Sequence, residues 1–472
     1  MRDLFLKLHA LFLRVWGEHP ECVSWNGHNL NDSGLFEEAA RLHIKILLPE
    51  ARKDGFPAWV RQEVRTAGLT PGGHVFTGAL YAACAAALLN TGEAAQARLL
   101  AEEAVSCSQF DLFAQNLILK ATHLIDPAAP NLEETDAWLQ TRFCTRPFTM
   151  IETTTSEEFY RCCPSYLPRS IGTFDTAKKK GLESVLKSPA AQALKDSILD
   201  GSFRHCSRLY CPFIGARTLP SREEGLKEIE TTGIFPSQVF FSHDLSCNLS
   251  CPSCRPEKVV AAKSEQERFD SLADDILVLL IAHGEKVSIC GSGDPFASIH
   301  FRNLLIQYCQ NAPEKKRKLA LQTNGVLCDA KAWASIGLYG HVTRVSVSAD
   351  AATPETYAIV RRGGNFGRMR ENMEFLAGLR RQGEIDTLGL CFVVQVQNFK
   401  EMPAFAQWGK TLGVDEVLFT RLRNWGTFSA DSYKSQNITS PDHPDHTALL
   451  DVLKDPALQD KRVNLGDLGN IL

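Results

Sequence analysis

Short apolar runs alternate with helical patterns between residues 236 and 425, and this alternation constrains the fold more than any other feature of the chain. It is typical of repeated strand–helix units around a parallel sheet, which predicts an α/β fold. Right-handed crossovers curl such a sheet toward a barrel, in which functional residues gather at the carboxyl ends of the strands. The six expected strands are Gln238 to Phe241, Val287 to Cys290, Leu319 to Gln322, Thr343 to Ser348, Leu388 to Val396 and Glu416 to Arg421.

The segments between these runs carry apolar residues at helical spacing. After the first strand, Ser264 and Glu267 have the spacing of a capping box, which predicts the start of a helix at this point. The expected apolar faces are Phe269, Leu272, Ala273, Ile276 and Leu280 in this helix, Phe301, Leu304, Leu305 and Tyr308 in a second, and Met402, Phe405, Trp408 and Leu412 in a third.

Three cysteines follow the first strand, namely Cys247, Cys251 and Cys254 at C-x3-C-x2-C spacing. Thiols this close can all bind one iron–sulfur cubane and leave one iron without a protein ligand, whereas a closed electron-transfer cubane takes four cysteines. An iron without a protein ligand can bind a small molecule and take part in chemistry. The alternative is a zinc loop, for which residues 255–260 offer no further Cys or His.

This loop resembles the cluster-binding motif of the radical S-adenosylmethionine (radical SAM) superfamily. The resemblance implies a [4Fe-4S] cluster whose open iron chelates the amino and carboxylate groups of S-adenosylmethionine. It implies reductive cleavage to a 5′-deoxyadenosyl radical, which removes a hydrogen atom from an unactivated C–H bond. It also implies a partial (βα)6 TIM-like barrel. Members often have an aromatic residue near the adenine just before the third cysteine, and here that position is Ser253.

The resemblance extends to the ends of the second and third strands. The sequence Gly291-Ser-Gly293-Asp294 looks like the glycine–acidic motif that receives the ammonium group of S-adenosylmethionine, with Asp294 in place of glutamate. Glycines there let the backbone approach a ligand closely. Asn324 follows the third strand and would lie beside the cofactor. An ordinary turn is the alternative at both places.

Further polar residues follow the fourth and fifth strands. Ser348 and Asp350 resemble the polar step that contacts the ribose, and Arg361 lies where relatives have an arginine near the cofactor carboxylate. Helix caps and a solvated arginine are the alternatives. Gln395 and Asn398 could face the substrate or the cofactor, or cap the next helix.

A second cysteine-containing segment precedes the predicted barrel, at residues 149–220. It resembles the SPASM/twitch module of radical SAM enzymes, which implies an auxiliary iron–sulfur cluster. In most relatives the module follows the barrel, and this chain lacks the larger cysteine set of a full SPASM domain, so we expect one auxiliary cluster. Buried or incidental cysteines are the alternative. The expected ligands are Cys162, Cys163, Cys206 and Cys211, with Cys144 as a substitute.

The remaining parts of the chain give weaker patterns. Residues 1–148 read as an α-helical domain, and residues 426–472 as a C-terminal covering tail. One tetratricopeptide-like helical hairpin fits the first part, with a generic helical domain as the alternative. The positions that fit the hairpin are Tyr81, Ala85, Leu88, Gly92, Ala97 and Ala104.

Charge and composition argue against nucleic-acid binding, a signal peptide and a membrane span. The chain has 51 basic and 55 acidic residues among 472, so it has no net field that would attract nucleic acid. Its basic runs, at residues 178–180 and 315–318, are expected on solvated faces or turns. Charged residues interrupt the apolar segment from Leu4 to Trp16, which predicts neither a signal peptide nor a membrane span. Fifteen cysteines then suit a reducing, cytoplasmic compartment.

The sequence therefore favours a radical SAM enzyme that acts on a peptide, a sugar or another small molecule, with a reductase or flavodoxin-type electron donor. Oxidation, cross-linking and epimerisation all remain open. Epimerisation would need a thiol that returns a hydrogen atom, and Cys290, Cys328 and Cys391 are the candidates in the barrel. The alternative is a helical-repeat interaction protein or an electron-transfer protein with non-catalytic clusters.

Overall fold

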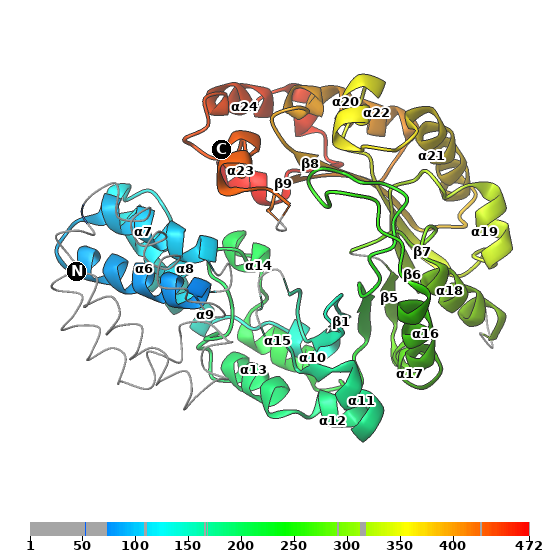
Figure 1. Cartoon of the computed structure of the whole chain (residues 1–472), viewed down its shortest axis with the longest axis horizontal. Coiled ribbons are helices and arrows are strands. Elements are labelled where there is room, and N and C mark those ends of the chain that lie inside the picture. The colour runs from blue at the N-terminus through cyan, green and yellow to red at the C-terminus, as the bar shows by residue number, and fades with distance from the viewer. Residues whose placement is uncertain are drawn as a thin grey trace. The chain divides into compact units, whose positions relative to one another are not determined.

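The computed structural model divides the chain into two compact units (Figure 1). Unit 1 comprises residues 1–144, 163–169 and 193–227, and unit 2 comprises residues 145–162, 170–192 and 228–472. The residues that the structure describes are Arg52, 73–107, 111–164, 167, 169–289, 292–311, 318–424 and 427–471. The expected helix from Leu4 to Trp16, together with Cys290 and Gly291, lies outside the described residues.

The described part of unit 1 is mainly helical. Its first two helices form a hairpin whose turn contains Gly92 in the left-handed conformation, with φ of 85°. The interface between them buries Tyr81, Ala85, Leu88, Ala97 and Ala104 completely, which confirms the helical pattern of this segment. The helices are α6 (Gly73–Asn90), α7 (Ala94–Cys107), α8 (Leu112–Ile125), α9 (Leu132–Gln140), α14 (Pro212–Gly215) and most of α15 (Arg222–Ile229), with α13 (Pro189–Leu199) crossing the boundary between the units.

Unit 2 is built on a ten-stranded sheet in the order β10-β9-β8-β7-β6-β5-β4-β1-β2-β3. Strands β4 to β9 pair in parallel with their neighbours in the order of the sequence. All six expected strands are therefore confirmed, with ends that differ from the expected ones by at most two residues. Their bounds are β4 (Gln238–Phe241), β5 (Lys286–Ile289), β6 (Leu319–Thr323), β7 (Val342–Ser348), β8 (Thr387–Val394) and β9 (Glu416–Arg421).

Four short strands extend this sheet beyond the expected six. Strand β1 (Met150–Thr153) pairs in parallel with β4, and β2 (Glu158–Tyr160) and β3 (Gly172–Thr173) continue from it in antiparallel pairs. At the other edge β10 (Val463–Asn464) pairs in parallel with β9. Residues on both sides of the predicted barrel thus contribute to its sheet.

Helices cover one face of the sheet in unit 2 (Figure 1). Strand residues that point to this face are buried, for example Val239, Val287, Val345 and Phe419. The predicted apolar helix residues are buried or packed against the same core. The helices along this region are α16 (Lys263–Leu272), the π-helix η1 (Ala273–Leu277), α17 (Val278–His283), α18 (Ile299–Asn311), α19 (Ala330–Ile336), α20 (Pro354–Val360), α21 (Phe366–Arg381) and α22 (Met402–Leu412).

The predicted capping box was wrong by two residues. The helix begins at Lys263, and the Glu265 carboxylate accepts a hydrogen bond of 2.8 Å from the backbone N–H of Ala262. A helix can use a glutamate at this third position even when the capping residue is alanine, because the glutamate still satisfies an unpaired N–H. The apolar face that the pattern predicts is unaffected.

The remaining segments of unit 2 are short. The segment after residue 425 contains two helices, two 3₁₀ turns and β10. Lys178 to Lys180 are exposed, as expected for a basic run, whereas Lys318 donates to the backbone carbonyls of Ile281 and Gly284. The remaining elements are α10 (Arg146–Thr149), α11 (Phe174–Lys180), α12 (Leu182–Leu186), η2 (Phe399–Glu401), α23 (Ala430–Gln436), α24 (His446–Leu453), η3 (Pro456–Gln459) and η4 (Gly466–Ile471).

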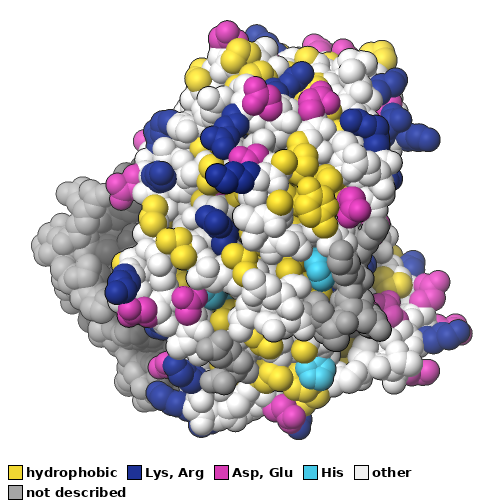
Figure 2. All heavy atoms as spheres, turned by 90° about the vertical axis from the view of Figure 1, so that its right-hand side faces the viewer, with side chains coloured by type: hydrophobic (Ala, Val, Ile, Leu, Met, Phe, Trp, Pro, Cys, Tyr) yellow, Lys and Arg dark blue, Asp and Glu magenta, His cyan; other side chains and the backbone are white. Residues whose placement is uncertain are grey.

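Basic and acidic side chains are intermixed on the face of the molecule shown in Figure 2. This distribution agrees with the near balance of charge in the sequence. Of the helices that the structure describes, none is both long and apolar enough to cross a membrane.

Two helical glycines in unit 2 should respond oppositely to alanine. A Cβ at Gly409 in α22 would lie 2.5 Å from Cγ2 of Val417 on β9, whereas a Cβ at Gly378 in α21 would meet nothing closer than 3.9 Å. We expect Gly409→Ala to lower the free energy of unfolding by about 1–3 kcal/mol through overpacking. Gly378→Ala should raise it by about 0.5–1 kcal/mol, because alanine favours the helix. Urea unfolding of both variants tests this, and equal shifts would contradict it.

Candidate functional site

The three cysteines of the C-x3-C-x2-C motif lie in the loop that follows β4, beside the carboxyl end of the parallel sheet. Cys247 and Cys251 are buried, and Cys254 is exposed. The backbone N–H groups of Cys254 and Arg255 both donate to the Cys251 carbonyl, at 2.9 Å, which folds the second half of the motif into one tight turn. The backbone N–H of Cys247 donates to the Val259 carbonyl at 2.9 Å and fixes the first half.

Each of the three sulfurs receives an N–H donor from a different side chain. Nδ2 of Asn324 lies 3.7 Å from Sγ of Cys247, and Nη1 of Arg361 lies 3.7 Å from Sγ of Cys251. Nη2 of Arg255 lies 3.4 Å from Sγ of Cys254. Donors of this kind stabilise thiolates, which are the form of cysteine that binds iron. The set of donors therefore fits an iron–sulfur cluster.

Burial raises the pKa of Cys247 and of Cys251 above the usual value for a thiol. For Cys251 the guanidinium of Arg361 acts against this effect. Iron would have to displace the protons of these two buried thiols, so binding of a cluster should release protons.

The glycine–acidic motif after β5 lies directly against the cysteine loop. A Cβ at Gly293 would meet the carbonyl oxygens of Asp244 at 2.5 Å and Ser246 at 2.6 Å, so only glycine fits this contact. The backbone N–H of Asp294 donates to the Ser246 carbonyl at 2.9 Å. The motif thus holds in place residues 244–246, which lead directly to Cys247.

The Asp294 carboxylate is buried and joins the ends of two strands. Its Oδ2 accepts hydrogen bonds from Oγ1 of Thr323 and the backbone N–H of Asn324, both at 2.8 Å, and Oδ1 accepts from the N–H of Phe296 at 3.0 Å. Burial raises the pKa of Asp294, while these donors lower it. The carboxylate serves at least to connect the loops after β5 and β6, a role that the sequence did not reveal.

Asp350 and Arg361 form a buried ion pair, with 2.8 Å between Oδ2 and Nη2. Oδ1 of Asp350 accepts the backbone N–H of Val393 at 2.8 Å, and its backbone has a positive φ of 57°. Burial alone would lower the pKa of Arg361, but Asp350 and Cys251 raise it, so the guanidinium is charged. The pair therefore connects the ends of β7 and β8 to the second cysteine.

Three buried donors in this region have no hydrogen-bond partner among the described residues. They are the hydroxyl of Tyr357, Nε of Arg361 and Nε2 of Gln395. Buried polar groups are normally paired, so these three donors are available to a ligand with several acceptor atoms. The carboxylate, ribose and adenine of S-adenosylmethionine supply such acceptors, and the residues present therefore fit this cofactor.

Asn398 and Ser348 have more local contacts. Nδ2 of Asn398 donates to the carbonyls of Asp350 and Val393 at 2.9 Å, and its Oδ1 accepts the N–H of Gln395 at 2.8 Å, so it ties the end of β8 to Asp350. Ser348 ends β7 in register with Cys391 on β8. Ser348 lies on the sheet face opposite the helices, which carries polar residues, and Asn398 is buried in the segment between β8 and η2.

This polar face also carries an unexpected carboxyl group, Glu152 on β1. It pairs in register with Phe240 on β4, and its Oε1 accepts a hydrogen bond of 3.2 Å from Oγ of Ser242. Burial raises the pKa of Glu152 to about 7, although Ser242 and Arg146 oppose the shift. Strand β1 was absent from the six predicted strands, so sequence reasoning missed this residue.

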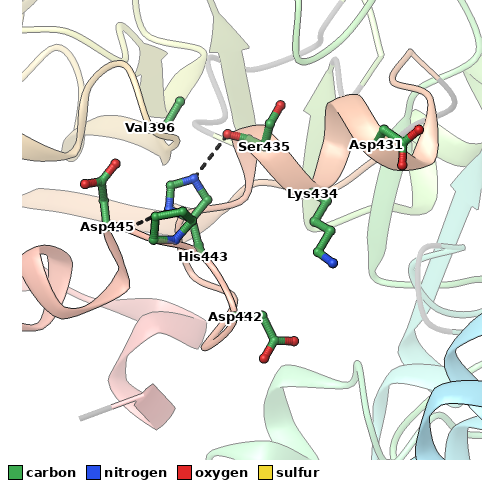
Figure 3. A pocket seen from close by; sticks show the side chains of 8 residues that line it. Val396, Asp431, Lys434, Ser435, Asp442, His443 and Asp445 are labelled. Atoms are coloured by element: carbon green, nitrogen blue, oxygen red, sulfur yellow. Dashed lines mark hydrogen bonds between the residues drawn. The ribbon is translucent and has the colours of Figure 1, made fainter.

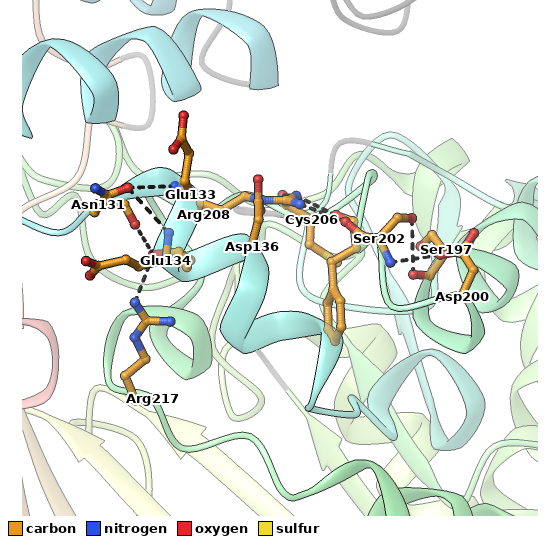
Figure 4. A network of polar contacts seen from close by, with 12 residues as sticks. Asn131, Glu133, Glu134, Asp136, Ser197, Asp200, Ser202, Cys206, Arg208 and Arg217 are labelled. Atoms are coloured by element: carbon orange, nitrogen blue, oxygen red, sulfur yellow. Dashed lines mark hydrogen bonds and ion pairs between the residues drawn. The ribbon is translucent and has the colours of Figure 1, made fainter.

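The expected auxiliary ligands lie in separate segments. Cys144, Cys163, Cys206 and Cys211 belong to unit 1, and Cys162 belongs to unit 2. Arg208 fixes the loop that leads to Cys206. Its guanidinium donates to the carbonyls of Ser202 at 2.7 Å, Phe203 at 2.5 Å and Cys206 at 2.9 Å, and pairs with Asp136 at 3.0 Å (Figure 4). Within the described ranges, no three His, Cys, Asp or Glu side chains are grouped as ligands of a single metal ion.

An open pocket of about 440 Å³ lies among α23, the loop before α24 and Val396 (Figure 3). His443 accepts the backbone N–H of Asp445 on Nδ1 at 3.1 Å, so its Nε2 carries the proton and donates to the Ser435 carbonyl at 3.2 Å. The other lining residues include Asp431, Lys434 and Asp442. Both ring nitrogens of His443 form hydrogen bonds within the protein, and the imidazole therefore stabilises the loop.

A buried histidine pair supports the start of the cysteine loop. Nε2 of His243 and Nε2 of His300 are 3.0 Å apart, His300 contacts Asp270 at 2.7 Å through Nδ1, and His243 contacts Thr153 at 2.8 Å through Nδ1. If His300 donates to Asp270, its Nε2 accepts the proton of His243, and both rings are neutral. Four phenylalanine rings surround His243, at centroid distances of 5.0–5.9 Å.

This pair should make unit 2 sensitive to acid. Burial lowers the pKa of His243 and of His300 below the usual value, so the unfolded chain binds protons more readily than the folded one. The stability that the neutral pair contributes is present above about pH 6.5 and is lost as the pH falls further. The thermal unfolding midpoint should therefore drop from pH 7 to pH 5. His243→Leu should show a shallower drop, and an equal slope would contradict this account.

A comparison with protein families finds a match over the region that contains the cysteine motif. A family model described as the Radical SAM superfamily matches residues 243–409, which is less than half of the chain. The GTP 3′,8-cyclase of Alkaliphilus oremlandii (strain OhILAs) is 28% identical over 133 residues, covering 27% of this chain and 39% of that protein. The GTP 3′,8-cyclase of Petrotoga mobilis (strain DSM 10674 / SJ95) is 31% identical over 132 residues, with the same coverage. The chain spans about two fifths of the length of these curated relatives.

Solved structures show more distant similarity. SuiB of Streptococcus suis, bound to the precursor peptide SuiA, is 16% identical with a TM-score of 0.35, over 59% of this chain and 61% of that chain. The radical S-adenosylmethionine methyltransferase TsrM of Kitasatospora setae, with tryptophan substrate and a SAM analogue bound, is 17% identical with a TM-score of 0.27, over 37% of this chain and 34% of that chain.

Proposed function

We propose that this chain, which carries a radical SAM domain at residues 243–409, is an enzyme that reductively cleaves S-adenosylmethionine at a [4Fe-4S] cluster. The cluster ligands would be Cys247, Cys251 and Cys254. The observation that carries this proposal is the set of three N–H donors, one on each cysteine sulfur, at the carboxyl end of the parallel sheet. When bound, the cluster and cofactor would supply an electron and a radical that abstracts hydrogen from the substrate.

The protein's own groups would hold the cofactor in place. The unpaired donors of Tyr357, Arg361 and Gln395 would bind its acceptor atoms. Gly291, Gly293 and Asp294 would shape the site for its ammonium group, and Ser348 with Asp350 would lie near its ribose. Asn324 would act from beside the cluster, because its amide reaches both Cys247 and Asn248. Most of these side chains are buried, and burial excludes water from the place where the radical would form.

The proposal includes a partial (βα)6 barrel over residues 236–425 and an auxiliary cluster of the SPASM/twitch type at residues 149–220. Cys163, Cys206 and Cys211 are the proposed auxiliary ligands, with Cys162 and Cys144 also available. The hydrogen bonds of Arg208 support the role of Cys206, because they hold the loop of residues 202–206, and with it this cysteine, in a fixed position.

The substrate would be a peptide, a sugar or another small polar molecule, and it would face the polar side of the sheet. That side offers hydrogen-bonding groups such as Ser288, Gln322 and Ser346, which the helices leave uncovered. A reductase or flavodoxin-type protein would supply the electron, in the reducing environment of the cytoplasm. For an epimerisation, Cys391 is better placed than Cys328. Cys328 is buried in the hydrophobic core, whereas Cys391 lies on the polar face. Burial raises the pKa of Cys391 to about 12, which keeps its S–H bond.

The test is anaerobic reconstitution with iron and sulfide, followed by reduction with dithionite and addition of S-adenosylmethionine. We expect the wild-type chain to hold roughly eight irons, four per cubane, and to form 5′-deoxyadenosine. A Cys247→Ala/Cys251→Ala/Cys254→Ala variant should lose about four irons and all 5′-deoxyadenosine formation. Roughly four irons in the wild type, with 5′-deoxyadenosine formed, would refute only the auxiliary cluster.

One outcome would favour the alternative function. If the wild-type chain keeps its iron but never forms 5′-deoxyadenosine, even with candidate peptides and sugars present, the clusters serve electron transfer or structure. The helical hairpin of α6 and α7 would then be the part to examine as an interaction surface.

A further inference from the structure

Arg255 directly follows the third cysteine and is almost completely buried, at 6% exposure. Its guanidinium makes three contacts. Nη1 donates to the carbonyl of Leu245, and Nη2 donates both to the carbonyl of Ser292 and to Sγ of Cys254, the last at 3.4 Å. One side chain therefore connects the beginning of the cysteine loop, its end, and the loop after β5.

The contacts of Arg255 leave its charge without a carboxylate partner. Among the described residues its guanidinium forms no ion pair with an Asp or Glu, and burying an unpaired cation is costly. Its contact of 3.4 Å to Sγ of Cys254 would place this cation beside the negative charge of a bound cluster.

We propose that Arg255 is a positioning residue that fixes Cys254 as the third cluster ligand and raises the reduction potential of the cluster. This inference rests on the proposed function, because it requires the cluster on these three cysteines. Reduction adds an electron to the cluster, and a nearby cation with an N–H donor on a ligand sulfur stabilises the added negative charge. Removing the guanidinium should therefore make the cluster harder to reduce.

Arg362, which follows α20, contacts the same cysteine loop and offers a matched control. Its Nε donates to Oγ of Ser250 at 3.2 Å, Nη2 donates to the carbonyl of Pro256, and its own carbonyl accepts the N–H of Ser250 at 3.0 Å. It is exposed, and within the described part of the chain it contacts no cysteine sulfur. Arg362 thus braces the cysteine loop as Arg255 does, but without the contact that the proposal requires.

The experiment compares the full-length wild-type chain with Arg255→Gln, Arg255→Lys and Arg362→Gln after reconstitution. Iron and sulfide contents are measured first, together with the thermal unfolding midpoint of the iron-free proteins. The potential of the cluster is then measured by redox titration with detection by electron paramagnetic resonance, without S-adenosylmethionine. To isolate this cluster, each titration is repeated in a background that lacks Cys163, Cys206 and Cys211.

We expect Arg255→Gln to have a more negative potential than the wild type, Arg255→Lys to lie between the two, and Arg362→Gln to match the wild type. Loss of iron from Arg255→Gln alone, with an unchanged unfolding midpoint of the iron-free chain, would also support the positioning role. A loaded Arg255→Gln with the wild-type potential would overturn the proposal, and so would equal loss of iron from Arg255→Gln and Arg362→Gln.

Failure of this inference is separable from failure of the proposed function. A wild-type chain that forms no 5′-deoxyadenosine refutes the enzymatic function, but the comparison of potentials among the variants still decides the role of Arg255. A wild-type chain that binds no iron at these cysteines refutes both.

Discussion

Asp350→Asn should lower the free energy of unfolding by about 3–5 kcal/mol, because it leaves the buried guanidinium of Arg361 without its counter-charge. Asparagine has nearly the same shape as aspartate and tolerates the left-handed backbone that this position adopts, with φ of 57°. Backbone strain therefore does not contribute to the expected loss. Urea unfolding of the iron-free chain measures the change directly.

A second variant separates the lost ion pair from other effects. Asp350→Asn/Arg361→Met removes both charges, and it should recover a large part of the stability lost in Asp350→Asn. The exposed pair of Lys187 and Glu183 is the control, since Glu183→Gln should change little. If the double variant is no more stable than Asp350→Asn, the buried charge is not the cause. The double variant should also fail to form 5′-deoxyadenosine, because it lacks the donor to Cys251.

Asp294→Asn should lower the free energy of unfolding by about 3 kcal/mol, since the amide can no longer accept all the hydrogen bonds that the carboxylate accepts. Three donors converge on Asp294, from Thr323, Asn324 and Phe296. The NH₂ group of an asparagine must face at least one of them as a second donor. The loops after β5 and β6 should separate, and 5′-deoxyadenosine formation should fall with them.

The control for this prediction is Asp442→Asn, at an exposed aspartate in the same unit. It should unfold at the wild-type urea midpoint. A wild-type midpoint for Asp294→Asn would show that the carboxylate does not hold the two strand ends together. Its role would then be limited to contacts with a bound ligand.

The central sheet could be predicted because its signal is local. Each of the six strands is an apolar run of a few residues bounded by polar or glycine-containing turns, and a helix at helical spacing follows most of them. Strands β1, β2, β3 and β10 lack this signal. Strands β2, β3 and β10 have three residues or fewer, and β1 pairs in parallel with β4, which lies more than 80 residues later in the chain.

Prediction of the candidate site has the same limit, because local patterns can be found in the sequence and long-range contacts cannot. Spacing singled out Cys247, Cys251 and Cys254, and the resemblance to the radical SAM superfamily singled out Asn324, Asp350 and Arg361 as candidates. Three-dimensional contacts were needed to find Arg255, which reaches the loop after β5, and the pair of His243 and His300, which come from distant segments. Arg255 had one available signal, since a charged residue directly after a cysteine is close enough to contact its sulfur.

The chain alternates between its two units, and this alternation constrains the order in which its parts can fold during synthesis. It passes from one unit to the other at residues 144, 162, 169, 192 and 227. Strand β1 emerges from the ribosome well before its partner β4, and β2 and β3 depend on β1 for their place in the sheet. The edge of β1 that pairs with β4 must therefore stay unpaired while about 85 further residues are synthesised. At typical rates this takes several seconds. Neither unit can be obtained as a single continuous fragment.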